Sequence, residues 1–98
     1  MQIEWTTTAK KNVRKIYLFY CKTASKKVAE KIIEPLFPFV KTLKKNPLIG
    51  QEELDLKFNK QGHRYLVNGH NKIVYRVKDD IIYITHVFDT RQSPKKLK

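Results

Sequence analysis

Residues 63–92 read HRYLVNGHNKIVYRVKDDIIYITHVFDTRQ, and this stretch decides the fold. Three runs rich in β-branched and aromatic residues are separated by two short polar segments, Asn68–Asn71 and Asp79–Asp80. Runs of this kind joined by tight turns are typical of antiparallel strands that follow one another in a sheet. The stretch therefore predicts a three-stranded antiparallel meander.

The middle run of the meander carries its charges at alternate positions. Because successive side chains of a strand point to opposite faces, one face is expected to pack inward and the other to face away. The inward face comprises Ile73, Tyr75 and Val77, and the outward face comprises Lys72, Val74, Arg76 and Lys78.

Basic side chains of the neighbouring runs are expected to join this outward face. The expected cluster consists of Arg64, Lys72, Arg76 and Arg91. Four cations around one sheet face would bind a phosphate and would stabilise the extra charge of a phosphoryl-transfer transition state. The alternative is that these charges only keep the sheet surface soluble.

The first third of the chain predicts a strand and an amphipathic helix. Residues 2–6 alternate like a short strand, and the threonines that follow supply a helix cap. Apolar residues then recur at helical spacing at Ala9, Val13, Ile16, Tyr17, Tyr20 and Ala24. Lysines and arginines fall on the opposite side of this helix, where solvation is the simplest interpretation of the charge.

A second helical pattern follows a turn at residues 23–25 and continues to about Asn46. Pro35 and Pro38 interrupt it, although the apolar phase is kept. One kinked helix is the preferred interpretation; the alternative is a stop near Glu34 and a restart with Pro38 in the first turn. The two patterns predict an antiparallel helical hairpin. Residues 51–60 are expected to be a short strand or an extended arm.

The order of strand, two helices and strands predicts an α+β domain, with the strand and helical hairpin packed on a twisted antiparallel sheet. The 98 residues are expected to form one domain, residues 1–98, with a frayed basic tail at residues 95–98. The net charge of +12 indicates an anionic partner: nucleic acid, a membrane surface or an acidic protein.

The single cysteine, Cys21, excludes an intrachain disulfide. No secretory signal and no membrane span is recognisable, so a cytoplasmic protein is expected. No phosphate loop, zinc signature or nucleophile elbow is present, and neither a cofactor nor a metal is expected. His70 is expected to be exposed and His86 to be partly buried, which leaves His63 as a candidate proton carrier.

The ordered combination of segments resembles the RelE/ParE superfamily of bacterial type II toxins. The segments that carry the resemblance are Ile3-Glu4-Trp5 before the hairpin, Leu43, Pro47-Leu48-Ile49-Gly50, residues 62–67, residues 72–77 and residues 84–94. The resemblance implies a growth-inhibiting toxin of a plasmid-stabilisation system. It also implies a cognate antitoxin whose acidic, partly disordered segment wraps the toxin. Leu18 and Phe19 are candidates for an apolar strip that such a segment covers.

The superfamily divides by target. RelE-like members are ribosome-dependent endoribonucleases that cut mRNA, and the resemblance then assigns catalytic roles to Arg64, Lys72, Arg76, Arg91 and His63. Their C-terminal helix often carries a Tyr, which residues 95–98 lack. ParE-like members instead poison DNA gyrase without hydrolytic residues, so whether this chain is an enzyme stays open. The remaining alternative is a non-catalytic basic module, or a degenerate toxin, that binds RNA or an acidic protein partner.

Overall fold

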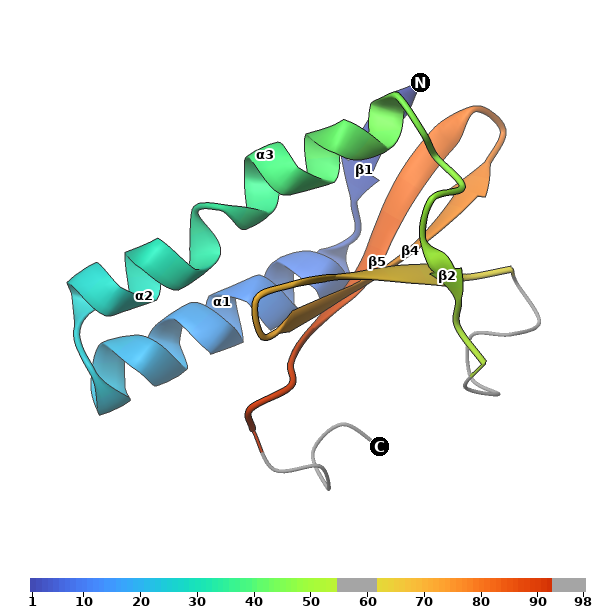
Figure 1. Cartoon of the computed structure of the whole chain (residues 1–98). Coiled ribbons are helices and arrows are strands. Elements are labelled where there is room, and N and C mark those ends of the chain that lie inside the picture. The colour runs from blue at the N-terminus through green and yellow to red at the C-terminus, as the bar shows by residue number, and fades with distance from the viewer. Residues whose placement is uncertain (55–61, 93–98) are drawn as a thin grey trace.

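The computed structural model of the chain describes residues 1–54 and 62–92. Two helical segments lie side by side against one face of a twisted five-stranded sheet, which confirms the predicted α+β class (Figure 1). The helices are α1 (Thr7–Thr23), α2 (Lys26–Ile33) and α3 (Leu36–Lys41), followed by the 3₁₀ turn η1 (Thr42–Lys44). The strands are β1 (Gln2–Trp5), β2 (Gln51–Glu52), β3 (Arg64–Asn68), β4 (Asn71–Lys78) and β5 (Ile81–Asp89).

The predicted meander forms strands β3, β4 and β5. The β3–β4 turn uses Gly69 at a φ of 59°, and the β4–β5 turn places Asp79 and Asp80 at 52° and 66°. Two-residue hairpin turns need positive φ because their twist then matches that of the flanking strands. The register has Val74 opposite His86 and Tyr75 opposite Ile84, so Thr85 is the extra residue of a bulge.

The sheet order is β1-β5-β4-β3-β2, and β1 runs parallel to β5. Ile3 and Trp5 stand beside Ile82 and Ile84, which places both side chains on the helix-facing side. Thr6 then anchors the start of α1: its hydroxyl accepts from Ala9 N–H at 3.1 Å. Strand β1 was predicted, but its partner and direction were not.

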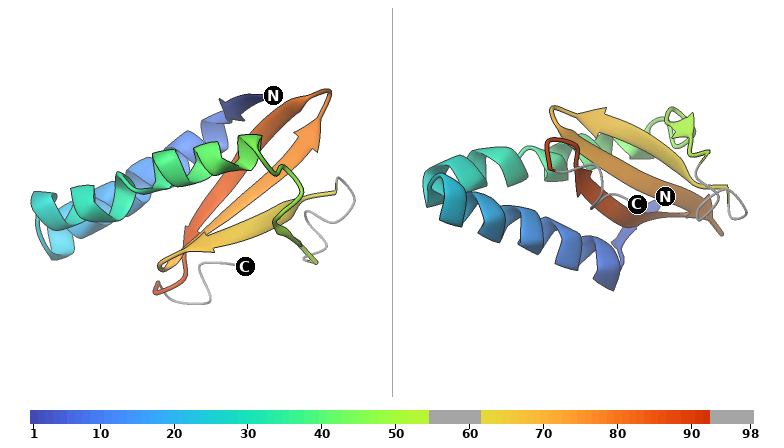
Figure 2. Two further views of the ribbon diagram at one scale, coloured as in Figure 1. Left: turned by 45° about the horizontal axis from the view of Figure 1, so that its top comes forward. Right: turned by 90° about the horizontal axis from the view of Figure 1, so that it is seen from below.

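The second helical pattern divides into two helices at Glu34 and Pro35, so the preferred single kinked helix is wrong and the alternative is correct. Pro35 has no N–H to continue the ladder, and its ring crowds the carbonyl one turn before it. Pro38 lies in the first turn of α3, where no intrahelical donor is required. The apolar phase survives the break, and Figure 2 shows α2 and α3 following one another along α1.

The core lies between the helices and the sheet. Its fully buried members include Leu36 and Leu43 from the helical segments and Ile73, Tyr75 and Ile84 from the sheet. Burial of this apolar surface, at about 25 cal/mol per Å², is the main favourable contribution to folding. Val74 lies on the face of the sheet away from the helices, as predicted, but it is fully buried there, so this face is also partly covered.

Candidate functional site

The expected cation cluster is divided by the sheet. Lys72 pairs with Phe88 and Arg76 with Tyr83, so both lie on the face away from the helices. Arg64 pairs with Tyr75, a core residue, and therefore belongs to the opposite face. The expectation that Arg64 joins the other two is wrong. The sequence feature that indicates the correct face is Leu66, which lies on the same face of the strand as Arg64 and, as an apolar residue, is expected to face the core.

Arg64 supports the entry into β2. Its guanidinium donates to the carbonyl of Gly50 at 2.9 Å, and the N–H of Gly50 donates to the Tyr75 hydroxyl at 2.8 Å. A Cβ atom built on Gly50 would lie 2.6 Å from that hydroxyl and 2.8 Å from the carbonyl of Tyr65. Only glycine fits this close approach. Burial raises the pKa of Tyr75.

Lys72 is held in an ion pair. Its ammonium lies 2.5 Å from a carboxylate oxygen of Glu53, whose side chain is only 7% exposed. The same ammonium lies 4.5 Å above the ring of Tyr65, and the Tyr65 hydroxyl donates to the Gln51 side chain at 2.9 Å. A buried carboxylate needs a compensating cation, so the charge of Lys72 is neutralised by Glu53 within the protein.

Arg76 is a second partly exposed cation on this face. Its guanidinium carbon is 5.7 Å from the centre of the Tyr83 ring. Four residues separate it from Lys72 along β4, which corresponds to about 13 Å of strand.

His63 is buried just before β3, and its carbonyl accepts from Glu53 N–H at 2.9 Å. Burial lowers the pKa of His86, and the nearby His63 lowers that pKa further. His86 also stacks on Phe88, with 5.8 Å between the ring centres. The structure therefore places His63 on the same face as Lys72. It lies next to His86, which was expected to be partly buried.

Arg91 follows the end of β5, close in register to Lys72, but its side chain lies on the α1 side of the sheet. Its backbone N–H donates to Asp89 at 2.9 Å, its Nε is 3.8 Å from the same carboxylate, and its guanidinium is 5.1 Å from the Tyr20 ring centre. The Tyr20 hydroxyl donates to the other oxygen of Asp89. Burial and this hydrogen bond raise the pKa of Tyr20. Arg91 is thus tied to α1 and not to Lys72.

No group of three or more potential metal ligands occurs among residues 1–54 and 62–92. The helices of this described part also lack the length and apolar character needed to cross a bilayer.

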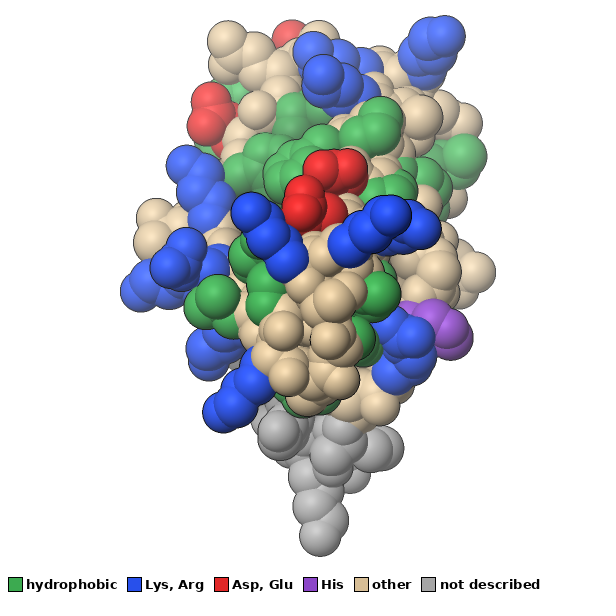
Figure 3. Space-filling view, turned by 90° about the vertical axis from the view of Figure 1, so that its left-hand side faces the viewer, with side chains coloured by type: hydrophobic (Ala, Val, Ile, Leu, Met, Phe, Trp, Pro, Cys, Tyr) green, Lys and Arg blue, Asp and Glu red, His purple; other side chains and the backbone are tan. Residues whose placement is uncertain are grey.

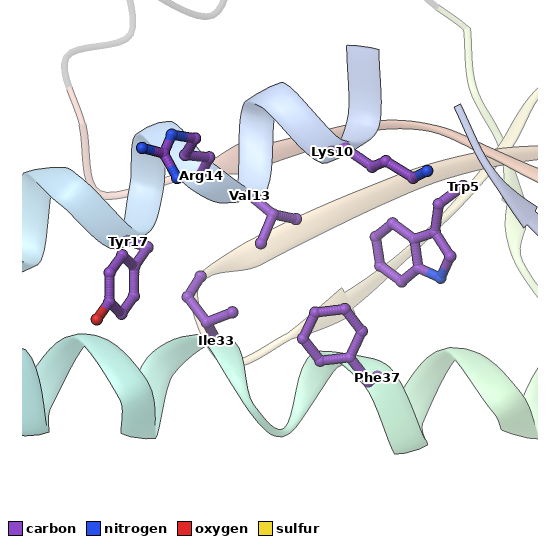
Figure 4. A pocket seen from close by; sticks show the side chains of 7 residues that line it. All are labelled: Trp5, Lys10, Val13, Arg14, Tyr17, Ile33 and Phe37. Carbon is purple, nitrogen blue, oxygen red and sulfur yellow. The ribbon is translucent and has the colours of Figure 1, made fainter. Parts of the chain in front are cut away.

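An apolar groove of about 410 Å³ lies between α1 and the α2–α3 segment. Figure 4 shows Val13 and Ile33 facing one another across it, with the rings of Trp5 and Phe37 at one end and Tyr17 at the other. The two rings lie 5.3 Å apart between centres. Val13 and Tyr17 belong to the predicted apolar face of the first helix; they pack against the core and also line this groove.

Lys10 and Arg14 come from α1 and form a basic rim on this groove. A second hollow of about 210 Å³ shares Trp5 and Phe37 with it and adds Lys41 and Lys44. The combined surface is therefore apolar in its floor and positive along its sides. Leu18 and Phe19 are also exposed, at 48% and 40%, on the outer side of α1.

The turn of the helical hairpin is basic as well. Figure 3 looks onto this end of the molecule and shows Lys and Arg side chains around acidic and hydrophobic ones. The exposed lysines near the turn are Lys22, Lys26, Lys27 and Lys31. Charge of one sign over two adjoining surfaces steers anionic partners toward them.

Comparison with known proteins identifies the fold and the family. Residues 3–94 match the family model described as ParE toxin of type II toxin-antitoxin system, parDE. A solved structure, the chromosomal ParDE TA system from P. aeruginosa, superposes with a TM-score of 0.77 and 22% sequence identity. That likeness covers 93% of this chain and 97% of the other. A search of the curated proteins gives no match.

Proposed function

The chain belongs to the ParE toxin family of type II toxin–antitoxin systems, and from this we propose that it acts on DNA gyrase in the cytoplasm without hydrolysing nucleic acid itself. The chain is the toxin component of such a system and has a cognate antitoxin as its partner. The gyrase target is the expectation for a ParE-like member of the superfamily.

The Glu53–Lys72 ion pair is the observation that carries the non-hydrolytic proposal. Cleavage by a metal-free ribonuclease needs several free cations around one phosphate, because the transition state gathers negative charge there. Lys72 is neutralised by a buried carboxylate at 2.5 Å, and Arg64 supports Gly50 from the other face of the sheet. Arg91 is held by Asp89 beyond β5. Lys72 and Arg64 thus have structural roles, and Arg91 is directed toward α1, so the four expected ligands do not surround one phosphate.

The test measures both targets with one protein preparation. Purified toxin is added to a gyrase supercoiling assay and to a translating bacterial extract, whose mRNA ends are mapped by primer extension. We expect inhibited supercoiling and intact mRNA. Ribosome-dependent cuts at codon spacing would overturn the proposal and restore Lys72, Arg76, Arg91 and His63 as candidate catalytic residues. Failure in both assays with folded protein would favour a degenerate toxin that only binds.

The antitoxin is proposed to place an amphipathic helix in the groove between α1 and α3. Apolar anchors at helical spacing would fill the floor formed by Val13, Ile33 and Phe37. Acidic residues beside these anchors would meet Lys10 and Arg14 on the rim. The charge complementarity favours an acidic helix over a second copy of this basic toxin.

A further inference from the structure

A separate pocket of about 230 Å³ lies where α2 meets the β3–β4 turn. Lys31 and Pro35 line it from the helical side, and Asn68, His70 and Asn71 line it from the turn. Arg91 completes the wall. The groove described above involves none of these residues, and the pocket faces a different part of the surface.

Asn71 is a buried side chain in this pocket with an unused acceptor. Its register opposite Asn68 and Asp89 puts it on the helix-facing side of the sheet, and it is only 5% exposed. Its Oδ1 atom finds no hydrogen-bond partner among residues 1–54 and 62–92. Buried polar atoms in folded proteins are nearly always paired, so an unpaired acceptor in a pocket wall indicates a donor supplied by a ligand.

The charged side chains that line the pocket are Lys31 and Arg91, both basic, and Arg91 is held in place. Asp89 and the Tyr20 ring fix the Arg91 side chain, which nevertheless stays 45% exposed. The turn is fixed in the same way, because the backbone N–H and hydroxyl of Thr90 both donate to the carbonyl of His70, at 2.7 and 2.8 Å. Within residues 1–54 and 62–92, no Asp or Glu lines the pocket, and the Asp89 carboxylate that pairs with Arg91 lies behind its wall. A preorganised basic wall of this kind favours an anion.

We propose that this pocket binds an acidic peptide segment. A glutamate or aspartate of the segment places its carboxylate against Arg91 and Lys31, and a main-chain N–H of the segment donates to Asn71 Oδ1. The methylene groups of the acidic residue lie against Pro35. A phosphodiester supplies the anion but no donor for Asn71, so the peptide satisfies the pocket more completely.

The antitoxin is the natural source of such a segment, and this last step rests on the proposed function. The pocket itself does not depend on which target the toxin attacks.

The experiment titrates ¹⁵N-labelled full-length protein with four probes and follows the amide signals by NMR. The first probe is a capped tetrapeptide with two glutamates between alanines, and the second has glutamines in place of the glutamates. Propionate carries a carboxylate without a donor, and inorganic phosphate stands for a nucleic-acid source. We expect saturable shifts at Gly69, His70, Asn71 and Lys31 with the glutamate peptide, and binding at least tenfold weaker with each other probe.

Two variants and a control locate the interaction. Asn71→Ala removes an acceptor that is unpaired in the described structure, so we expect unchanged stability of the free protein and about tenfold weaker peptide binding. Lys31→Gln is expected to weaken binding by about threefold to tenfold. The matched control Lys27→Gln changes an exposed lysine on the same helix and should leave binding unchanged.

Some results would overturn the proposal. These are the absence of saturable shifts, equal effects of Lys31→Gln and Lys27→Gln, or phosphate binding more tightly than the glutamate peptide. The last result would assign the pocket to nucleic-acid phosphate. Peptide binding by a toxin that leaves gyrase unaffected would keep this site and reject the proposed target, so the two failures are distinguishable.

Discussion

At the scale of single residues, the charges on the sheet have structural partners. Glu53 and Lys72 form an ion pair in which the carboxylate is nearly buried and the ammonium is about one-third exposed. Removing one member of such a pair leaves the other without its charge partner, which costs more than the intact pair contributes. Stability measurements therefore distinguish a structural Lys72 from a catalytic one.

We expect Lys72→Ala to lower the free energy of unfolding by about 2–3 kcal/mol, because the Glu53 carboxylate stays buried without its ammonium partner. Urea unfolding followed by circular dichroism measures this change. Lys78→Ala is the matched control, since Lys78 is an exposed lysine on the same strand. Equal urea midpoints for Lys72→Ala and the original protein would show that the ion pair contributes little.

Gly50→Ala is expected to lower the free energy of unfolding by about 1–3 kcal/mol, because its Cβ collides with the Tyr75 ring and with backbone. Gly69→Ala is the comparison variant, because its expected loss of stability comes from backbone strain and not from a collision. Its Cβ meets open space, but a φ of 59° costs an alanine about 1–2 kcal/mol. Adding Tyr75→Phe should recover part of the loss in Gly50→Ala and none in Gly69→Ala. Equal behaviour of both would contradict the collision.

The lowered pKa of His86 makes stability depend on pH. The unfolded chain takes up a proton near the ordinary value of 6.5, whereas the folded protein does so only at lower pH. The His86 contribution to stability is therefore fully present above about pH 6.5 and is lost as the pH falls through the folded pKa. Thermal midpoints between pH 8 and pH 5 should fall less steeply for His86→Phe than for the original protein. Parallel pH profiles would refute this linkage.

At the scale of elements, turns and helix breaks follow from local backbone chemistry. Pro35 ends α2 and Pro38 is accepted in the first turn of α3 because the two positions need different hydrogen bonds. The β4–β5 turn instead places two aspartates in the left-handed region of backbone conformation, which glycine adopts at lower steric cost.

Asp80→Gly should raise the free energy of unfolding by about 0.5–1 kcal/mol. The substitution relieves a φ of 66°, and the aspartate–glycine pair that results is preferred in such hairpin turns. Asp80→Ala keeps the strain and should give no gain. Urea midpoints of the two variants settle the comparison, and a loss of stability in Asp80→Gly would mean that chain entropy outweighs strain here.

At the scale of the whole molecule, the helical pair is a binding surface as well as a cover for the sheet. One side of the pair buries the core, and the other leaves an apolar groove with a basic rim. The net charge of +12 on the whole chain favours rapid association with an acidic partner, and that association should weaken with salt.

Phe37→Asp tests the groove. Phe37 is 43% exposed, so we expect a folded toxin whose antitoxin affinity falls at least tenfold, because an apolar anchor site gains a charge that repels an acidic helix. Leu48→Asp is the control, since Leu48 is 60% exposed and does not line the groove. Calorimetric titration with the antitoxin measures both. Equal losses in the two variants would place the antitoxin elsewhere.

The sequence by itself determined the local elements. Alternation and turn residues specified the meander, and apolar spacing with threonine and proline specified the helices, because these depend on neighbours within a few residues. Only the tertiary structure decided that β1 runs parallel beside β5, that Arg64 lies on the other face of the sheet from Lys72, and that Glu53 neutralises Lys72. Register between distant segments is set by the packing of the completed core, and no periodicity within one segment contains it.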